Sequence, residues 1–262
     1  MPLFARAMST QSVGQDLARV EGRPRAVPTG VRSVDERLGG GFQVGELTLV
    51  AHRPDCEGLD WVFGAVHRAV KRRNAAAVLT ERRDEAELNA RLVALAAQVD
   101  PFRAVAGLAS AEDRLRMTAA RRKVPWRRIA VLAGRAITPP EIDELVFSYR
   151  PLLVVGELRP RAPDASRPQR VDSYREGIER LASLARRHHV AMVLLHSLPE
   201  GAAAPRLGEL PDRGRLSESA STVVLAHQEN ERLVLRVPRL AGNALEEPVH
   251  VRLRRPVFTA SA

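Results

Sequence analysis

The sequence is poor in cysteine and in aromatic residues. Cys56 is the only cysteine among 262 residues, and Phe, Trp and Tyr together make up 4% of the chain. A single cysteine excludes a disulfide framework and a cysteine-based metal site. Because 45% of the residues are hydrophobic, the chain can still build a core, and we expect that core to be aliphatic.

Long hydrophobic runs are also missing. No apolar stretch reaches the length of a membrane-spanning helix, and the first residues, MPLFARAMSTQSVGQ, lack the apolar centre of a signal peptide. We therefore expect a cytoplasmic protein without a membrane partner.

Negative charge is in short supply. Lys and Arg number 41 against 31 for Asp and Glu, which gives a net charge of +10 and a pI near 11.1. Such an excess indicates an anionic partner, most often nucleic acid. A GC-rich genome would explain the preference for Arg over Lys better than it explains the net excess.

The stretch from Thr29 to Asp60 has the layout of a nucleotide-binding strand and loop but lacks the residues that hold phosphates. A working phosphate loop reads G-x-x-x-x-G-K-[ST], in which the lysine reaches the outer phosphates and the hydroxyl binds Mg²⁺. Here the Gly-Lys-Thr is replaced by Glu57-Gly58-Leu59. A carboxylate repels phosphate and leucine cannot bind a metal, so we expect no nucleotide cofactor. The alternative is unusual binding in which Arg53 replaces the lysine.

Apolar runs alternate with helical patterns along the chain. We expect strands at 46–51, 75–80, 129–133, 152–155, 190–195, 222–227, 233–237 and 249–254, and helices at 34–38, 60–73, 84–98, 139–148 and 172–188. This alternation predicts an α/β fold with a mostly parallel central sheet flanked by helices. The last strands should be antiparallel. Residues 1–25 are interpreted as a flexible tail, with a possible helix at 11–20, and residues 26–262 as one domain.

The order of these pieces resembles the C-terminal motor domain of DnaB-type hexameric replicative helicases, over nearly all of residues 29–253. The segments that carry the resemblance are Thr29-Gly30 with Asp35, Gly40-Gly41, Gly45-Glu46-Leu47, Ala51-x-Arg53-Pro54, and the ranges 142–155, 190–198 and 210–227. The resemblance implies a RecA-like P-loop NTPase fold. It also implies functional positions that can be compared one at a time.

Several of the family's functional positions are lost here. Its phosphate-loop Lys and Thr fall on Gly58 and Leu59, and its metal-organising Asp falls on Gly156. A register shift of one residue would bring in the carboxylate of Glu157, although adjacent residues of a strand point to opposite faces. The family's Gln after the fifth strand falls on Ser197, so the resemblance implies a degenerate ATPase site.

Two of the family's catalytic positions survive. Glu81 matches the base that activates water, although without nucleotide it would be only a vestige at a strand end. Arg239 matches the arginine finger given to a neighbouring subunit, but it could equally pair with a carboxylate. The finger's usual lysine companion falls on Val237.

Arginines gather in two segments that correspond to the channel-facing loops of the family. They are Arg159, Arg161, Arg167 and Arg170 in the first segment, and Arg206, Arg213 and Arg215 in the second. They suit contacts with DNA phosphates that do not read sequence, and no aromatic residue is present for base stacking. A second basic patch spans residues 121–128. The alternative for both is a solvated charged surface.

Our leading hypothesis is a non-catalytic, pseudo-ATPase relative of the DnaB-type motor that acts in DNA replication, recombination or repair. It would bind single-stranded DNA without sequence preference, or a RecA-like or replication or repair protein. One alternative is an ATP-dependent DNA helicase with a divergent site that uses ATP and Mg²⁺. Another is a protein adaptor that docks on a RecA-like partner. We expect no metal site.

Overall fold

The computed structural model describes residues 26–53, 60–157, 169–201, 204–229, 232–241 and 243–254. A short hairpin of β1 (Ala26–Val27) and β2 (Phe42–Gln43) encloses α2 (Arg32–Arg37) and opens the fold. Neither strand of this hairpin was predicted from the sequence. The tail at residues 1–25, with its expected helix, lies outside the described residues.

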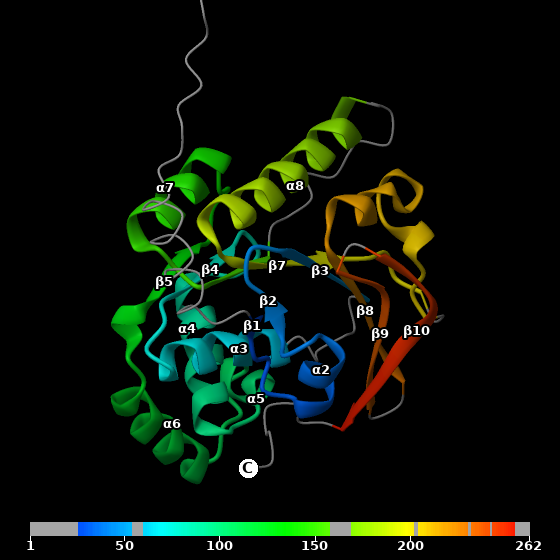
Figure 1. Cartoon of the computed structure of the whole chain (residues 1–262). Coiled ribbons are helices and arrows are strands. Elements are labelled where there is room, and N and C mark those ends of the chain that lie inside the picture. The colour runs from blue at the N-terminus through cyan, green and yellow to red at the C-terminus, as the bar shows by residue number, and fades with distance from the viewer. Residues whose placement is uncertain are drawn as a thin grey trace, which may run out of the picture.

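The described part of the chain holds one eight-stranded sheet in the order β10-β9-β8-β3-β7-β6-β4-β5 (Figure 1). Its strands are β3 (Leu47–His52), β4 (Ala76–Thr80), β5 (Ile129–Ala133), β6 (Leu153–Glu157), β7 (Ala191–Ser197), β8 (Thr222–Glu229), β9 (Arg232–Leu240) and β10 (Asn243–Arg254). The six strands from β8 to β5 are parallel, and β8–β9 and β9–β10 are antiparallel. The predicted sheet, including its antiparallel end, is therefore confirmed.

Helices cover both faces of the sheet, as Figure 1 shows. They are α3 (Asp60–Lys71), α4 (Glu85–Ala97), α5 (Pro101–Val105), α6 (Ala111–Lys123), α7 (Pro139–Tyr149) and α8 (Gln169–His188). Side chains of α3 and α4 pack with one face of the sheet, and side chains of α7 and α8 pack with the other. Because both faces are covered, the central strands are apolar throughout rather than alternating.

Three helices begin at residues whose side chains cap them. Asp84, Asp100 and Ser110 each accept a backbone N–H at the start of a helix, which satisfies donors that the helix itself leaves unpaired. The sequence did not predict α5 or α6. The second arginine segment, which the resemblance placed in a loop, contains the 3₁₀ helix η3 (Leu207–Glu209) and the start of η4 (Asp212–Ser219), so it is not wholly a loop.

The core is mostly aliphatic, and Phe42, Trp61 and Phe63 are fully buried aromatic residues in the described part of the chain. Leu, Val, Ile and Ala dominate both clusters of buried residues. Phe42 stacks on Trp61 with ring centroids 5.6 Å apart, and this contact fastens the β1–β2 hairpin to α3.

Candidate functional site at the carboxyl edge of the sheet

The parallel strands bring their last residues together at one edge, where ligands bind in open α/β sheets. His52 ends β3 beside Ser197 of β7, and Thr80 ends β4 beside Glu157 of β6. This edge carries the positions that the family comparison marks as functional. Its geometry decides which of their side chains remain available to a ligand.

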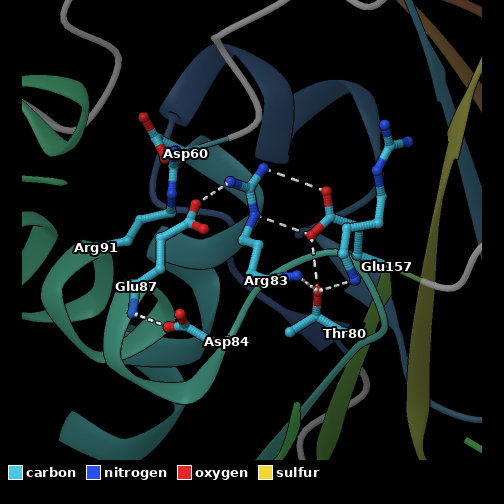
Figure 2. A network of polar contacts seen from close by, with 8 residues as sticks. Asp60, Thr80, Arg83, Asp84, Glu87, Arg91 and Glu157 are labelled. Carbon is cyan, nitrogen blue, oxygen red and sulfur yellow. Dashed lines mark hydrogen bonds and ion pairs between the residues drawn. The ribbon is translucent and has the colours of Figure 1, made fainter. Parts of the chain in front are cut away.

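Glu157 is the most buried acid at this edge, with 4% of its surface exposed. Its Oε2 accepts hydrogen bonds from Thr80 Oγ1 at 3.0 Å and from Arg83 Nε at 2.9 Å. Its Oε1 accepts from Arg83 Nη2 at 3.2 Å. Figure 2 shows the guanidinium facing the carboxylate side on. The two-point contact is the strong form of this ion pair, and it leaves no oxygen of Glu157 without a protein partner.

A turn at the end of β4 places Arg83 against Glu157. Thr80 Oγ1 accepts the backbone N–H groups of Arg82 and Arg83 at 3.2 and 3.3 Å, so the threonine both shapes the turn and donates to Glu157. Arg83 also pairs with Glu87 of α4 (Figure 2). Burial lowers the pKa of Arg83, but the carboxylates of Glu157 and Glu87 outweigh burial, and its pKa is raised.

A second buried pair stands beside this network. Arg91 Nη1 of α4 lies 2.6 Å from Asp60 Oδ1, at the first residue of α3 (Figure 2). Burial raises the pKa of Asp60, and the neighbouring Arg91 opposes that rise. In a phosphate-binding fold the first turn of this helix faces the phosphates. Here a carboxylate occupies that turn, and an arginine from the protein neutralises it.

Arg53, which could have replaced the missing lysine, is occupied elsewhere. Its side chain is 6% exposed, and its Nη1 donates to Pro199 O at 2.9 Å and pairs with Glu209 Oε2 at 2.7 Å. Its guanidinium packs on Gly201, where an added Cβ would lie 3.1 Å from Arg53 Cζ. Arg53 therefore ties the end of β3 to the segment that follows β7. The adjacent residues Pro54, Glu57, Gly58 and Leu59 lie outside the described residues.

Glu81 and Gly156 lie where the resemblance expects them. Glu81 follows β4, and its Oε1 accepts the backbone N–H of Ile137 at 2.7 Å, so its carboxylate anchors the segment that leads into α7. Gly156 is buried in β6 opposite Leu79 and Leu194 and offers no side chain at the metal-organising position. A catalytic role of Glu81 stays a prediction.

Two buried histidines stand at the same edge. Burial, together with a smaller contribution from the nearby His52, lowers the pKa of His196 to about 4. Burial also lowers the pKa of His52, whose Nδ1 lies 2.9 Å from Arg53 O. Both rings are therefore neutral at pH 7 and add no positive charge for a phosphate. In the described ranges no group of three or more His, Cys, Asp or Glu side chains could hold a metal ion.

Arg239 lies near the end of β9, opposite Val223 and Ala244. A bulge between β8 and β9 pairs Arg236 with Leu225 two residues further along β8, so both arginines lie on the face of the sheet that α8 covers. Both are half-buried, and within the described part of the chain their Nε atoms have no hydrogen-bond partner. The arginine-finger role stays a prediction.

The structure describes only part of the predicted DNA-contacting arginines. Arg206 is exposed, and its backbone N–H donates to Glu209, the partner of Arg53. The backbone at Arg170, Arg213 and Arg215 lies in α8 and η4, but their side chains are not among those described. Arg159, Arg161 and Arg167 lie outside the described residues.

Sequence reasoning missed the network around Glu157. Glu157 was considered only as a shifted metal ligand, and no partner was predicted for Thr80, Arg83 or Arg91. One signal was available, because Thr80, Arg83 and Glu87 follow one another at the end of an apolar strand and lead into a helix. That signal does not reveal that β6 lies beside β4 and brings Glu157 within reach.

Comparison with known proteins identifies the fold. The ATPase domain of G40P is 14% identical, with a TM-score of 0.72, and the match covers 95% of each chain. A DnaB-like replicative helicase, studied with its interactions with primase, is 15% identical, with a TM-score of 0.71. The match with that helicase covers 97% of this chain and 65% of the helicase chain.

The chain has the RecA-like fold of a DnaB-type helicase ATPase domain. The expected resemblance is thus confirmed at the level of the fold. No protein-family model and no curated protein matches the sequence. In the described segments no helix combines the length and apolarity needed to cross a bilayer.

Proposed function

We propose that this chain is a non-catalytic relative of the DnaB-type helicase motor that binds single-stranded DNA without sequence preference. The observation that carries the proposal is that both carboxylate oxygens of Glu157 already accept hydrogen bonds from protein groups. Arg83 and Thr80 occupy both oxygens of the carboxylate next to the vacated metal-organising position. A carboxylate that already neutralises a buried guanidinium cannot also balance the charge of a metal ion.

The other charges at this edge support the same proposal. Phosphoryl transfer depends on cations and metal ions placed around the phosphates. Arg53 forms an ion pair with Glu209, and Asp60 at the start of α3 forms one with Arg91. The described residues therefore do not fit Mg²⁺-ATP. Losing one charge-stabilising group typically slows such a reaction by about 10²–10³-fold, so combined losses should abolish turnover.

Binding of DNA would use the arginines that follow β6 and β7. The net charge of +10 supports an anionic partner. Arg53 holds the segment after β7 through Pro199 and Glu209. This supports a DNA-binding surface on that segment whose shape does not depend on nucleotide. In an ATP-driven motor this segment would have to move. The likeness to replicative helicases supports a proposed role in DNA replication, recombination or repair.

A phosphate-release assay with ATP, Mg²⁺ and single-stranded DNA tests the catalytic part. We expect no release above a protein-free blank. Robust release that disappears in Glu81→Gln would overturn the proposal and favour the divergent helicase.

DNA binding is tested by fluorescence anisotropy of a labelled oligothymidine in a series of salt concentrations. Binding should weaken steeply with salt, and Arg206→Gln should weaken it more than Arg186→Gln, an exposed control on α8. Equal binding with and without ATP is expected. Capture of a replication or repair protein with no DNA binding would favour the adaptor instead.

A further inference from the structure

A basic cavity lies at the far end of α3 from the Glu157 network. Its volume is about 740 Å³, and its charged lining consists of Arg32, Asp35, Glu36, Arg68, Lys71 and Arg72. Because α3 runs from the carboxyl edge to the amino edge of the sheet, Lys71 lies about 16 Å along the helix axis from Asp60, at 1.5 Å per residue. The cavity is therefore separate from the site described above.

The carboxylates of its two acidic residues already accept hydrogen bonds from protein groups. Asp35 Oδ1 accepts from the backbone N–H and the hydroxyl of Thr29, both at 2.7 Å, and Oδ2 accepts from Gly30 N–H at 3.1 Å. Glu36 Oε1 accepts from Arg32 Nε at 2.8 Å. Hydrogen bonds to three donors hold the Asp35 charge in place, and Arg32 balances Glu36.

Among the described residues, Arg68, Lys71 and Arg72 form no ion pair with a carboxylate. Arg68 and Lys71 lie in the last turn of α3 and Arg72 directly follows it, at spacings of i, i+3 and i+4 where like charges repel one another. Burial lowers the pKa of Arg68, with a further contribution from Arg72, while Asp35 opposes this. Lys71 and Arg72 are exposed, and neither side chain has a partner among the described residues. A bound anion would relieve this repulsion.

The protein holds one of these cations in a fixed position. Arg68 Nε donates to Thr29 O at 3.3 Å, and its Nη2 donates to Gly30 O at 3.1 Å. Gly30 has φ +90°, and a Cβ added there would lie 1.4 Å from Arg68 Nε. Carbonyl groups fix the guanidinium without neutralising it. Such a pre-organised cation loses little entropy when it binds a ligand.

We propose that this cavity binds a phosphate group, either of a nucleic-acid strand or of a free di- or triphosphate. Arg68 supplies a planar fork of donors that suits phosphate oxygens, and Lys71 and Arg72 add charge at the rim. The volume lies within the range of small-molecule sites. The proposal does not depend on DNA binding at the carboxyl edge, because the two sites share no residue.

The test compares two double variants of the full chain. Lys71→Gln with Arg72→Gln removes the rim cations. Arg186→Gln with Arg187→Gln removes the same charge from the last turn of α8 and serves as control. All four side chains are exposed, so both variants should fold, which circular dichroism verifies.

Titration calorimetry with inorganic pyrophosphate is the first measurement. We expect binding at least tenfold weaker in the Lys71/Arg72 variant and unchanged in the control. Equal affinity for pyrophosphate in both variants and the parent protein, or no binding to any of them, overturns the proposal.

The salt dependence of oligothymidine binding then separates the two sources of phosphate. Loss of two phosphate contacts should reduce the slope of log K against log salt by about 1.4 in the Lys71/Arg72 variant relative to the control. That result identifies a nucleic-acid strand. Equal slopes, together with weakened pyrophosphate binding, identify a free phosphate compound. A defect in Arg206→Gln alone would report on the carboxyl edge and not on this cavity.

Discussion

The charged side chains at the two ends of α3 differ in whether they form ion pairs. At its start, Asp60 pairs with Arg91, and Glu157 next to it pairs with Arg83 (Figure 2). At its end, Lys71 and Arg72 face an open cavity. A buried charge without a partner costs several kcal/mol, whereas an exposed cation costs little. At the carboxyl edge, where the fold usually holds nucleotide, the charged side chains form ion pairs with one another. At the amino edge, Lys71 and Arg72 are exposed to solvent.

The largest effect is expected from breaking the buried pair. Glu157→Gln keeps the shape of the side chain but leaves the Arg83 guanidinium with only Glu87 as a counter-charge. We expect a loss of about 3 kcal/mol in the free energy of unfolding, as for other broken buried pairs. Urea denaturation measures it.

The matched control replaces both partners. Arg83→Met combined with Glu157→Leu should cost less than Glu157→Gln, because no buried charge is left without a partner and Glu87, which also loses Arg83, is 29% exposed. A double variant that is less stable than either single replacement would contradict the idea that the pair is held by mutual neutralisation.

Acid should destabilise the carboxyl edge through His196. Its folded pKa is lowered to about 4 by burial, while an unfolded histidine titrates near 6.5. Between these values the unfolded chain binds more protons, so stability is complete above about pH 6.5 and falls toward pH 4 by about 1.4 kcal/mol per pH unit.

Thermal melting from pH 7 to pH 4 measures this slope. His196→Asn should reduce the slope by about 1.4 kcal/mol per pH unit, while His52 and His67, whose pKa values burial also lowers, continue to contribute. His189→Asn, at an exposed position after α8, should leave the slope unchanged. Equal slopes in both variants would show that His196 does not carry the effect.

A smaller loss of stability is expected from two Gly→Ala replacements, whose comparison separates backbone strain from packing at the amino edge. Gly30 and Gly45 have φ values of +90° and +86°, but only at Gly30 would a Cβ collide with a neighbour, Arg68. Alanine should strain the backbone equally at both positions. Gly30→Ala should therefore cost about 1–2 kcal/mol more than Gly45→Ala, because Arg68 would lose its hydrogen bonds to the carbonyl groups of Thr29 and Gly30. Chemical denaturation of the two variants measures the difference, and equal losses would show that Arg68 moves aside freely.

The smallest effect is expected at the exposed pair of the amino edge. Arg32 and Glu36 are 92% and 61% exposed. Ion pairs of this kind contribute little, because water already solvates both groups. Arg32→Gln should leave the melting temperature within experimental error. A loss comparable with that of Glu157→Gln would remove the contrast between the two ends of α3.

Much of the fold could be predicted from local patterns. The apolar runs that became β3, β4 and β5 were located to within one residue at each end, because parallel strands buried on both faces are apolar throughout. The β1–β2 hairpin, α5 and α6 escaped prediction. Helix α6 buries only Ala120 and therefore shows no apolar stripe. Each strand of the hairpin has two residues, and α5 has five, too few to show a period.

The candidate site was predictable only as a set of positions. Glu81 follows β4, and Gly156 and Glu157 are the last two residues of β6 rather than residues after it; their functional roles stay predictions. The partner of Arg53 could not be predicted, because Pro199 lies 146 residues away in the sequence. The basic cavity was also missed, since Arg68 is one arginine among many until Gly30 is seen packed against it.

The sequence by itself determined that this chain builds an α/β sheet and that it lacks the lysine and hydroxyl of a phosphate loop. The tertiary structure alone decided which charges neutralise one another. Arg83 and Glu157 are 74 residues apart and meet because β4 lies beside β6. Strand order arises from long-range packing of helices on both faces of the sheet, and no local pattern of residues encodes it.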